Sequence, residues 1–163
     1  MMRKPVSQNV KPGFQRMPGI LIRRALQYHN TIFSEETQGR DITAPQFGAL
    51  RALFEFPGVD QATLAKFLAL DRATVGGLVD RLELKGLVRR TLDPNDRRAR
   101  VLHLTPRGRV LLNALRPNVA RVSERMLASL TPEERQFFLD ILERMVDRES
   151  TLEQDDDGLL VAT

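Results

Sequence analysis

The sequence predicts a mainly α (α+β) fold with six helices and one β-hairpin. Three observations support this class. Apolar residues recur at helical spacing along most of the chain, helix-capping residues precede five of these stretches, and two segments rich in strand-forming residues flank a turn sequence. The 163 residues are 42% hydrophobic and 28% charged, which is typical of a globular protein large enough to bury a core.

The composition restricts the classes of function. The chain has no cysteine, which excludes disulfides, zinc–cysteine sites and thiol redox switches. No apolar run approaches the ~20 residues needed to span a bilayer, and the N-terminus lacks the apolar segment of a secretory signal, so we expect a cytoplasmic protein with no membrane contact. The net charge of +4 says little about nucleic acid, because the placement of charge matters more than its total.

The N-terminal part is expected to be a flexible basic arm over residues 1–17, followed by a helix over 18–39. This helix carries two adjacent apolar stripes, and such a wide apolar sector suggests contacts on two sides. The stripes are Ile22, Leu26, His29, Phe33 and Leu21, Ala25, Tyr28, Ile32.

Three capped helices are expected in the middle of the chain. Thr43 opens a capping box with a proline in the first turn, and the helix that follows ends at the FPG sequence 56–58. Asp60 and Asp71 are the expected N-caps of two shorter helices joined by a tight turn, which is the pattern of a helix-turn-helix. The residues expected to face inward in the first two of these helices are Phe47, Leu50, Leu53, Phe54, Leu64, Phe67 and Leu68.

The helix at 71–84 has one apolar side and one unusually bare side. Val75, Leu78, Val79 and Leu82 recur at helical spacing and should pack inward. The opposite side includes two glycines, each of which costs a helix about 1 kcal/mol relative to alanine. We interpret the bare side as a surface for close approach of a broad partner. Its members are Ala73, Thr74, Gly76, Gly77, Asp80 and Arg81.

A β-hairpin is expected directly after this helix. The segments 87–92 and 99–104 have strand-forming residues and flank the turn sequence DPND. Between positions 89 and 100 the hairpin carries five arginines and two aspartates, a net charge of +3. A helix with a bare outer side beside a basic hairpin suits duplex DNA, because the helix fits the major groove and the arginines can reach the backbone and the minor groove.

Two long helices are expected after the hairpin. Thr105 and Pro106 start the first, and its apolar pattern continues past Pro117, which should bend the helix rather than end it. Thr131 opens a second capping box at the start of the last helix. Residues 151–163 are expected to form an acidic flexible tail.

The run LDRATVGGLVDRLELKGLVRRTLDPNDRRARVLHLTPRG resembles the winged helix-turn-helix core of the multiple-antibiotic-resistance regulator (MarR) family of bacterial transcription factors. The sequence DPNDRRAR running into LTPRG is the most specific feature of this resemblance, which covers roughly residues 18 to 150. It implies a DNA-binding domain at 40–104 and helices at 18–39 and 105–150 that interlace with a second subunit as an intertwined dimerisation domain. Such a homodimer would read a pseudo-palindromic operator with half-sites about 34–36 Å apart.

The candidate DNA contacts lie on the bare helix side and in the hairpin. Thr74 can hydrogen-bond to a base edge or a phosphate and Arg81 can pair with phosphate or guanine, whereas Asp80 should orient an arginine. By resemblance, Asp96 braces the hairpin and an arginine enters the minor groove, and the sequence leaves Arg97 and Arg98 as alternatives for this role. The alternative to DNA binding is that the helix is an ordinary surface helix and that the arginines form a solvated charged face. The full set is Arg72, Ala73, Thr74, Gly76, Gly77, Arg81, Asp96, Arg97, Arg98 and Arg100.

The first helix also holds candidate effector-binding residues. One interpretation makes them ordinary packing residues and surface charges. The other follows from the resemblance, because family members commonly bind small aromatic or phenolic anions between the dimerisation helices and the winged helix, and PGILIRRALQ resembles the opening of members that regulate aromatic-compound catabolism. An arginine or histidine would pair with a carboxylate or acyl thioester effector beside an apolar wall. The candidates are Arg23, Arg24, Tyr28, His29, Phe33, Phe47 and Phe54.

Nothing in the sequence favours catalysis, a cofactor or a metal site. There is no glycine-rich phosphate loop, and His29 and His103 are isolated in the sequence. The basic hairpin beside the bare helix side, together with what the resemblance implies, predicts a homodimeric transcriptional repressor that a small aromatic effector releases from its operator. The alternative is a winged-helix module for protein contacts or effector-independent DNA architecture, and the salt dependence of DNA binding separates the two. A hydrolase would require a polar cluster in a cleft.

Overall fold

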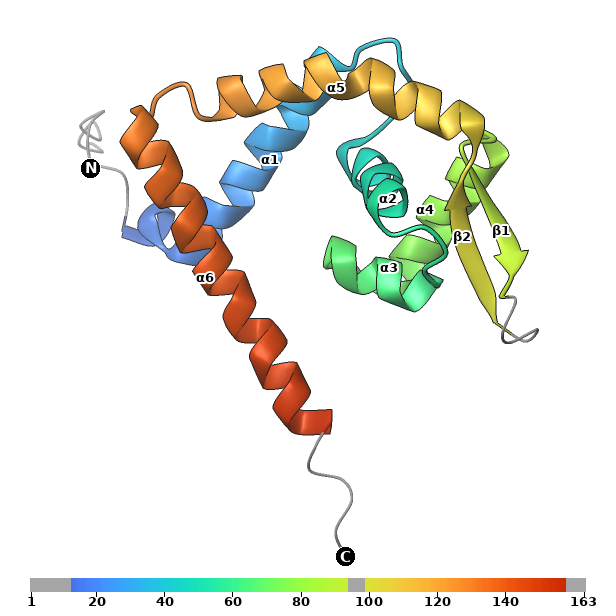
Figure 1. Cartoon of the computed structure of the whole chain (residues 1–163). Coiled ribbons are helices and arrows are strands. Elements are labelled where there is room, and N and C mark those ends of the chain that lie inside the picture. The colour runs from blue at the N-terminus through green and yellow to red at the C-terminus, as the bar shows by residue number, and fades with distance from the viewer. Residues whose placement is uncertain (1–12, 94–98, 158–163) are drawn as a thin grey trace, which may run out of the picture. The chain divides into compact units, whose positions relative to one another are not determined.

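The computed structural model describes residues 13–93 and 99–157, with side chains described as far as Asp147. Two compact units, 1–123 and 124–163, divide the chain. The described elements are η1 (Gly13–Arg16), α1 (Pro18–Glu36), α2 (Ala44–Glu55), α3 (Gln61–Leu68), α4 (Arg72–Leu84), β1 (Val88–Leu92), β2 (Arg100–Leu104), α5 (Pro106–Met126) and α6 (Pro132–Asp157) (Figure 1). The predicted six helices and hairpin are confirmed, and the short 3₁₀ helix η1 lies inside the segment expected to be a flexible arm.

The expected capping residues start the helices. The amide of Gln46 donates to the hydroxyl of Thr43 at 3.4 Å, and the amide of Thr43 donates to Oε1 of Gln46 at 3.2 Å, which completes the predicted capping box of α2. Thr131 and Glu134 form the same arrangement before α6. Because each of these bonds spans only three residues, the helix starts could be predicted from local sequence.

The core of the winged helix lies between α2, α3, α4 and the hairpin, which Figure 1 shows gathered beside one another. The four residues predicted to face inward on α4 are all buried. They meet apolar side chains from the other elements, and such burial of aliphatic groups is the main stabilising term of a small domain. The buried side chains at this centre include Leu50, Leu53, Leu64, Val75, Val79, Leu82, Val88 and Leu102.

The two-stranded sheet makes backbone contacts that the sequence did not predict. Strands β1 and β2 pair antiparallel from Val88 opposite Leu104 to Leu92 opposite Arg100. A third segment joins β2, because Gly58 donates to the carbonyl of Leu102 and Leu102 donates to that of Val59, with a bridge between Asp60 and Val101. The middle of β2, opposite Arg90 and Thr91 of β1, is thus tied to the segment between α2 and α3.

Two phenylalanines that were expected to face inward lie at the surface instead. Phe67 is 48% exposed and stacks on Phe56, with ring centroids 4.9 Å apart. Phe54 is 38% exposed and packs against the guanidinium groups of Arg51 and Arg109. On an eight-residue helix such as α3 the buried sector is narrow, and Leu64 and Ala65 occupy it, so the helical spacing alone placed Phe67 wrongly.

The first helix buries little of its wide apolar sector. Only Ile32 and Phe33 of α1 are buried, and most of the other large apolar side chains are exposed. The C-terminal end of α1 is held by α5, where Arg121 Nε lies 2.7 Å from Oε2 of Glu36 and the side-chain amide of Asn118 donates to the Glu36 carbonyl. As predicted, α5 continues through Pro117.

The last helix is longer than expected. The structure extends α6 to Asp157, seven residues past the boundary expected at 150. Leu152, Glu153 and Gln154 are good helix formers, which accounts for the extension into the acidic tail. Large apolar side chains of α6 are exposed in the single chain, namely Phe137, Leu139, Met145 and Val146.

Candidate DNA-binding surface

A cap and a left-handed residue set the position of α4 after α3. Ala69 adopts a positive φ of 50° and ends α3. Asp71 then caps α4, because its Oδ1 accepts from the amide of Thr74 at 2.8 Å and its Oδ2 accepts from the Thr74 hydroxyl at 2.5 Å. These two bonds hold the pKa of Asp71 below its ordinary value of 3.8, and the bond from the Thr74 hydroxyl has the larger effect. The predicted helix-turn-helix is therefore present.

The outward side of α4 carries most of the predicted DNA contacts. Arg72, Ala73, Thr74 and Arg81 are all exposed. Arg72 also lies near the N-terminus of α3. The amide and hydroxyl of Thr63 are the main causes of the lowered pKa of Asp60 there, and the charge of Arg72 lowers it further.

The two glycines of α4 have different surroundings. A Cβ on Gly77 would meet only the end of the Arg81 side chain, at 3.9 Å, so this glycine leaves open space on the outward side. A Cβ on Gly76 would lie 3.2 Å from Nε2 of Gln61 on α3. Gly76 therefore allows α3 and α4 to pack closely, and its surroundings are less open than those of Gly77.

A groove of about 520 Å³ runs beside this surface, between α4 and the start of α2. Thr74 and Arg81 line it together with the apolar side chains of Leu70 and Leu78. At one end, Nζ of Lys85 lies 3.0 Å from Oδ2 of Asp41. This ion pair ties the α1–α2 connection to the C-terminal end of α4.

The hairpin brings further arginines beside α4. Arg89 and Arg100 are exposed, as expected for groups that meet a polyanion. Arg90 is different, because Nη2 of its guanidinium lies 2.6 Å from Oδ1 of Asp80 and Nη1 pairs with Oε2 of Glu83. The prediction that Asp80 orients an arginine is confirmed. The predicted wing residues Asp96, Arg97 and Arg98 lie outside the described residues.

The predicted effector residues fall into separate places in the described chain. His29, Phe33 and Phe47 come together, with ring centroids 6.2 Å apart for the first pair and 5.8 Å for the second. Arg24 and Tyr28 are exposed on α1. Phe54 belongs to the surface cluster with Arg51 and Arg109 described above.

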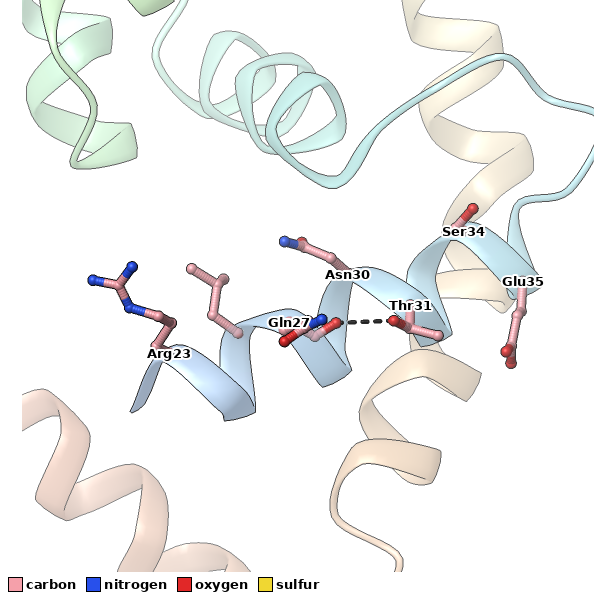
Figure 2. Close-up of a pocket in the computed structure, with 7 residues that line it drawn as sticks. Arg23, Gln27, Asn30, Thr31, Ser34 and Glu35 are labelled. Atoms are coloured by element: carbon pink, nitrogen blue, oxygen red, sulfur yellow. Dashed lines mark hydrogen bonds between the residues drawn. The ribbon is translucent and has the colours of Figure 1, made fainter. Parts of the chain in front are cut away.

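Arg23 lies instead on a groove of about 650 Å³ along α1. Figure 2 shows Arg23 near one end and Glu35 near the other, with the hydrogen bond from the Thr31 hydroxyl to the Gln27 carbonyl between them. The residues that line it are Arg23, Leu26, Gln27, Asn30, Thr31, Ser34 and Glu35.

Sequence reasoning missed several residues that organise this surface. Gln61, Lys85 and Glu83 act through partners on other elements, and no local pattern marks them. Arg90 had a usable signal, because strand alternation places it on the same side of the hairpin as the buried Val88. An arginine on that side needs a partner, and carboxylates on the neighbouring helix were the available ones.

Over the described part of the chain, no group of three or more histidine, aspartate or glutamate side chains is placed to hold a metal ion. In the same residues, no helix combines the length and the apolar character that crossing a membrane requires.

Comparison with known proteins identifies the family. Residues 42–99 match the MarR family. The chain is 39% identical over 129 residues to the HTH-type transcriptional repressor NicR of Pseudomonas putida, covering 79% of this chain and 82% of that one. The structure is similar to that of BpsR from Bordetella bronchiseptica, with a TM-score of 0.78, 33% identity, and coverage of 85% of this chain and 99% of that one.

The repressor CouR, solved bound to a 23-mer DNA duplex, is also similar, with a TM-score of 0.77, 30% identity, and coverage of 85% of this chain and 99% of that one. The helix-turn-helix, the hairpin beside it and the overall chain thus agree with regulators of one family. The chain belongs to the MarR family and is a DNA-binding transcriptional regulator.

Proposed function

We propose that this protein is a cytoplasmic, non-enzymatic repressor that binds a pseudo-palindromic operator as a homodimer and leaves it when a small aromatic acid binds. The observation that carries the proposal is the pairing of Asp80 on the outward side of α4 with Arg90 of β1, which places the basic hairpin beside the bare helix side. With this arrangement, the helix can enter the major groove of a duplex while the basic hairpin reaches the neighbouring minor groove.

Separate groups of residues perform the two parts of DNA recognition in this proposal. The major groove is contacted from α4 by Arg72, Ala73, Thr74, Gly77 and Arg81. Gly76 supports the contact between α3 and α4 rather than touching DNA. The wing arginines Arg97, Arg98 and Arg100 act at the backbone and the minor groove, where arginine is favoured by the concentrated negative potential, and Asp96 braces the hairpin.

A second copy of the chain covers the apolar side chains that one copy leaves exposed. In the single chain, large apolar side chains are exposed on two helices. They are Leu21, Ile22 and Leu26 on α1 and Phe137 and Met145 on α6. Burying exposed apolar side chains of this kind stabilises an obligate dimer. A two-fold dimer presents two α4 helices, which matches half-sites one helical turn apart.

The effector is proposed to be a small aromatic carboxylate. BpsR, to which this structure is similar, has its DNA binding regulated by 6-hydroxynicotinic acid. The cluster of His29, Phe33 and Phe47 offers an apolar wall with one imidazole ring. Arg23 and Arg24, on the same helix as His29, offer cations for a carboxylate. Repression is relieved only if the effector binds the DNA-free state more tightly than the DNA-bound state.

A binding experiment tests both parts. A duplex selected from a random library by the wild-type protein is titrated in a mobility-shift assay over a range of salt concentrations, with and without 6-hydroxynicotinic acid, phenolic acids and their acyl thioesters. A steep negative salt slope and sequence preference are expected, with weaker binding in the presence of one effector. Arg98→Ala should weaken operator binding without dissociating the dimer.

Two outcomes would contradict the proposal in different ways. Binding that does not depend on salt or sequence would favour a module for protein contacts. Sequence-specific binding that no aromatic acid or thioester alters would leave effector-independent DNA architecture as the better account. Phe47→Ala and His29→Gln separate the effector site from the DNA surface, because only the response to effector should change.

A further inference from the structure

Arg90 is the most enclosed arginine of the hairpin described here. Its side chain is 18% exposed, although it lies on a two-stranded sheet in which Arg89 and Arg100 are exposed. Its guanidinium contacts two carboxylates of α4, Asp80 at 2.6 Å and Glu83 through the other terminal nitrogen. Its backbone amide also donates to Oε1 of Glu83, at 3.1 Å.

These contacts keep Arg90 charged and bind its guanidinium to two carboxylates. Burial lowers the pKa of Arg90, but the hydrogen bonds and charges of Asp80 and Glu83 outweigh burial and raise it above its ordinary value. The planar guanidinium is well shaped for two carboxylates at once. The two carboxylates balance the charge of the guanidinium, and their own negative charges oppose the approach of a phosphate oxygen to it.

We propose that Arg90 is a positioning residue that, with Asp80 and Glu83, fixes the hairpin against the recognition helix α4 and does not itself bind DNA. The proposal rests on the proposed function, in which α4 and the hairpin contact one operator together. In this proposal, Arg90 has a structural role, whereas other arginines of the hairpin, such as Arg100, contact DNA.

The local chain explains why such a clamp is needed. Only residues 85–87 separate α4 from β1, and Gly86 adopts a positive φ of 67° there. The amide of Leu87 still bonds to the Leu82 carbonyl, so the base of the hairpin is fixed. The clamp acts further along β1, at Arg90. Leu102 of β2, opposite Arg90, bonds to the α2–α3 segment, so the clamp ties the other strand of the hairpin to α4, and the two ties together restrict rotation about this base. Contacts in two adjacent grooves require that angle to be set before binding.

The salt dependence of binding distinguishes a clamp from a phosphate ligand. Removing one phosphate contact lowers the steepness of log K against log salt by about 0.9. Arg100→Met, the matched control, should therefore flatten the slope by that amount. Arg90→Met should leave the slope unchanged, lower affinity for the selected operator about tenfold, and change affinity for a scrambled duplex much less.

A second set of variants approaches the clamp from α4. Asp80→Asn combined with Glu83→Gln frees Arg90 and removes two negative charges. The clamp predicts a lower ratio of operator to scrambled-duplex affinity, and no further fall when Arg90→Met is added, because all three changes break one unit. A phosphate-binding Arg90 predicts instead that freeing it strengthens operator binding and steepens the slope.

The outcomes separate the two proposals. A wild-type protein without salt-dependent, sequence-specific binding overturns the proposed function. If the wild-type protein binds the operator and Arg90→Met flattens the slope of log K against log salt as much as Arg100→Met does, the clamp alone is overturned. Should Arg90→Met fail to fold in a thermal melt, Arg90→Lys keeps the cation and the alkyl chain but cannot bond both carboxylates. The clamp then predicts a reduced specificity ratio, and a ratio equal to wild type rejects it.

Discussion

The hydroxyl of Thr74 donates its proton to Oδ2 of Asp71, 2.5 Å away, at the first turn of the recognition helix. A hydroxyl has one proton to donate and two lone pairs to accept with. Thr74 therefore presents lone pairs and a methyl group outward while this bond exists. Such a group can accept a hydrogen bond from the amino group of adenine or cytosine, or contact a thymine methyl, but it cannot donate to a phosphate.

We predict that Thr74→Val changes sequence preference. The substitution keeps the methyl group and removes the acceptor, so affinity for the selected operator should fall about two- to tenfold, with little change for a scrambled duplex. Repeating the selection with the variant should show relaxed preference at one base pair in each half-site. An equal loss on every duplex would show that Thr74 serves the backbone instead.

Acid stability should depend on the same pair. Because the folded-state pKa of Asp71 is lowered from 3.8, its contribution is fully present above that pH and is lost as pH falls through the folded value. Asp71→Asn should therefore lose less stability than wild type on acidification below about pH 3.8. Urea denaturation at a series of pH values measures this. Thr74→Val removes the first cause of the shift and should flatten the dependence too, whereas unchanged acid profiles would contradict the cap.

Gly108 should not tolerate a side chain. An added Cβ would lie 2.1 Å from the carbonyl oxygen of Leu87 and 2.9 Å from Cδ1 of Leu104, and the backbone atom cannot move aside cheaply. Gly108→Ala should lower the free energy of unfolding by about 3 kcal/mol or more. This is measured by urea denaturation, with Gly19→Ala as a control because its Cβ would meet nothing within 4 Å. A near-neutral Gly108→Ala would show that α5 does not pack this closely on the hairpin.

Gly77→Ala should separate stability from function. Its Cβ enters open space on a helix, so stability should rise by about 0.5–1 kcal/mol. The added methyl group projects from the proposed DNA surface, so operator affinity should fall in a mobility-shift titration. Gly76→Ala, whose Cβ meets the flexible end of Gln61, provides the comparison, because its effect should be on folding. Operator affinity unchanged in Gly77→Ala would remove Gly77 from the interface.

The sequence by itself determined the local structure and the class of protein. The helix starts at Thr43, Asp60 and Asp71 depend on bonds between residues three apart, and the inward side of α4 follows from its spacing. The hairpin joins strands close in sequence, so it was also predictable. These features are carried by neighbours along the chain, and together with the resemblance to the MarR family they predicted a DNA-binding regulator.

Only the tertiary structure decided what each outward residue contacts. Arg90 is clamped because Asp80 and Glu83, on another element, meet it, and the space beside Gly76 is limited by Gln61 of α3. Phe67 lies at the surface because other side chains fill the space beneath α3. Spacing along one helix assigns a direction to a side chain, but burial and pairing depend on the elements that the fold brings to that side, and these are distant in sequence.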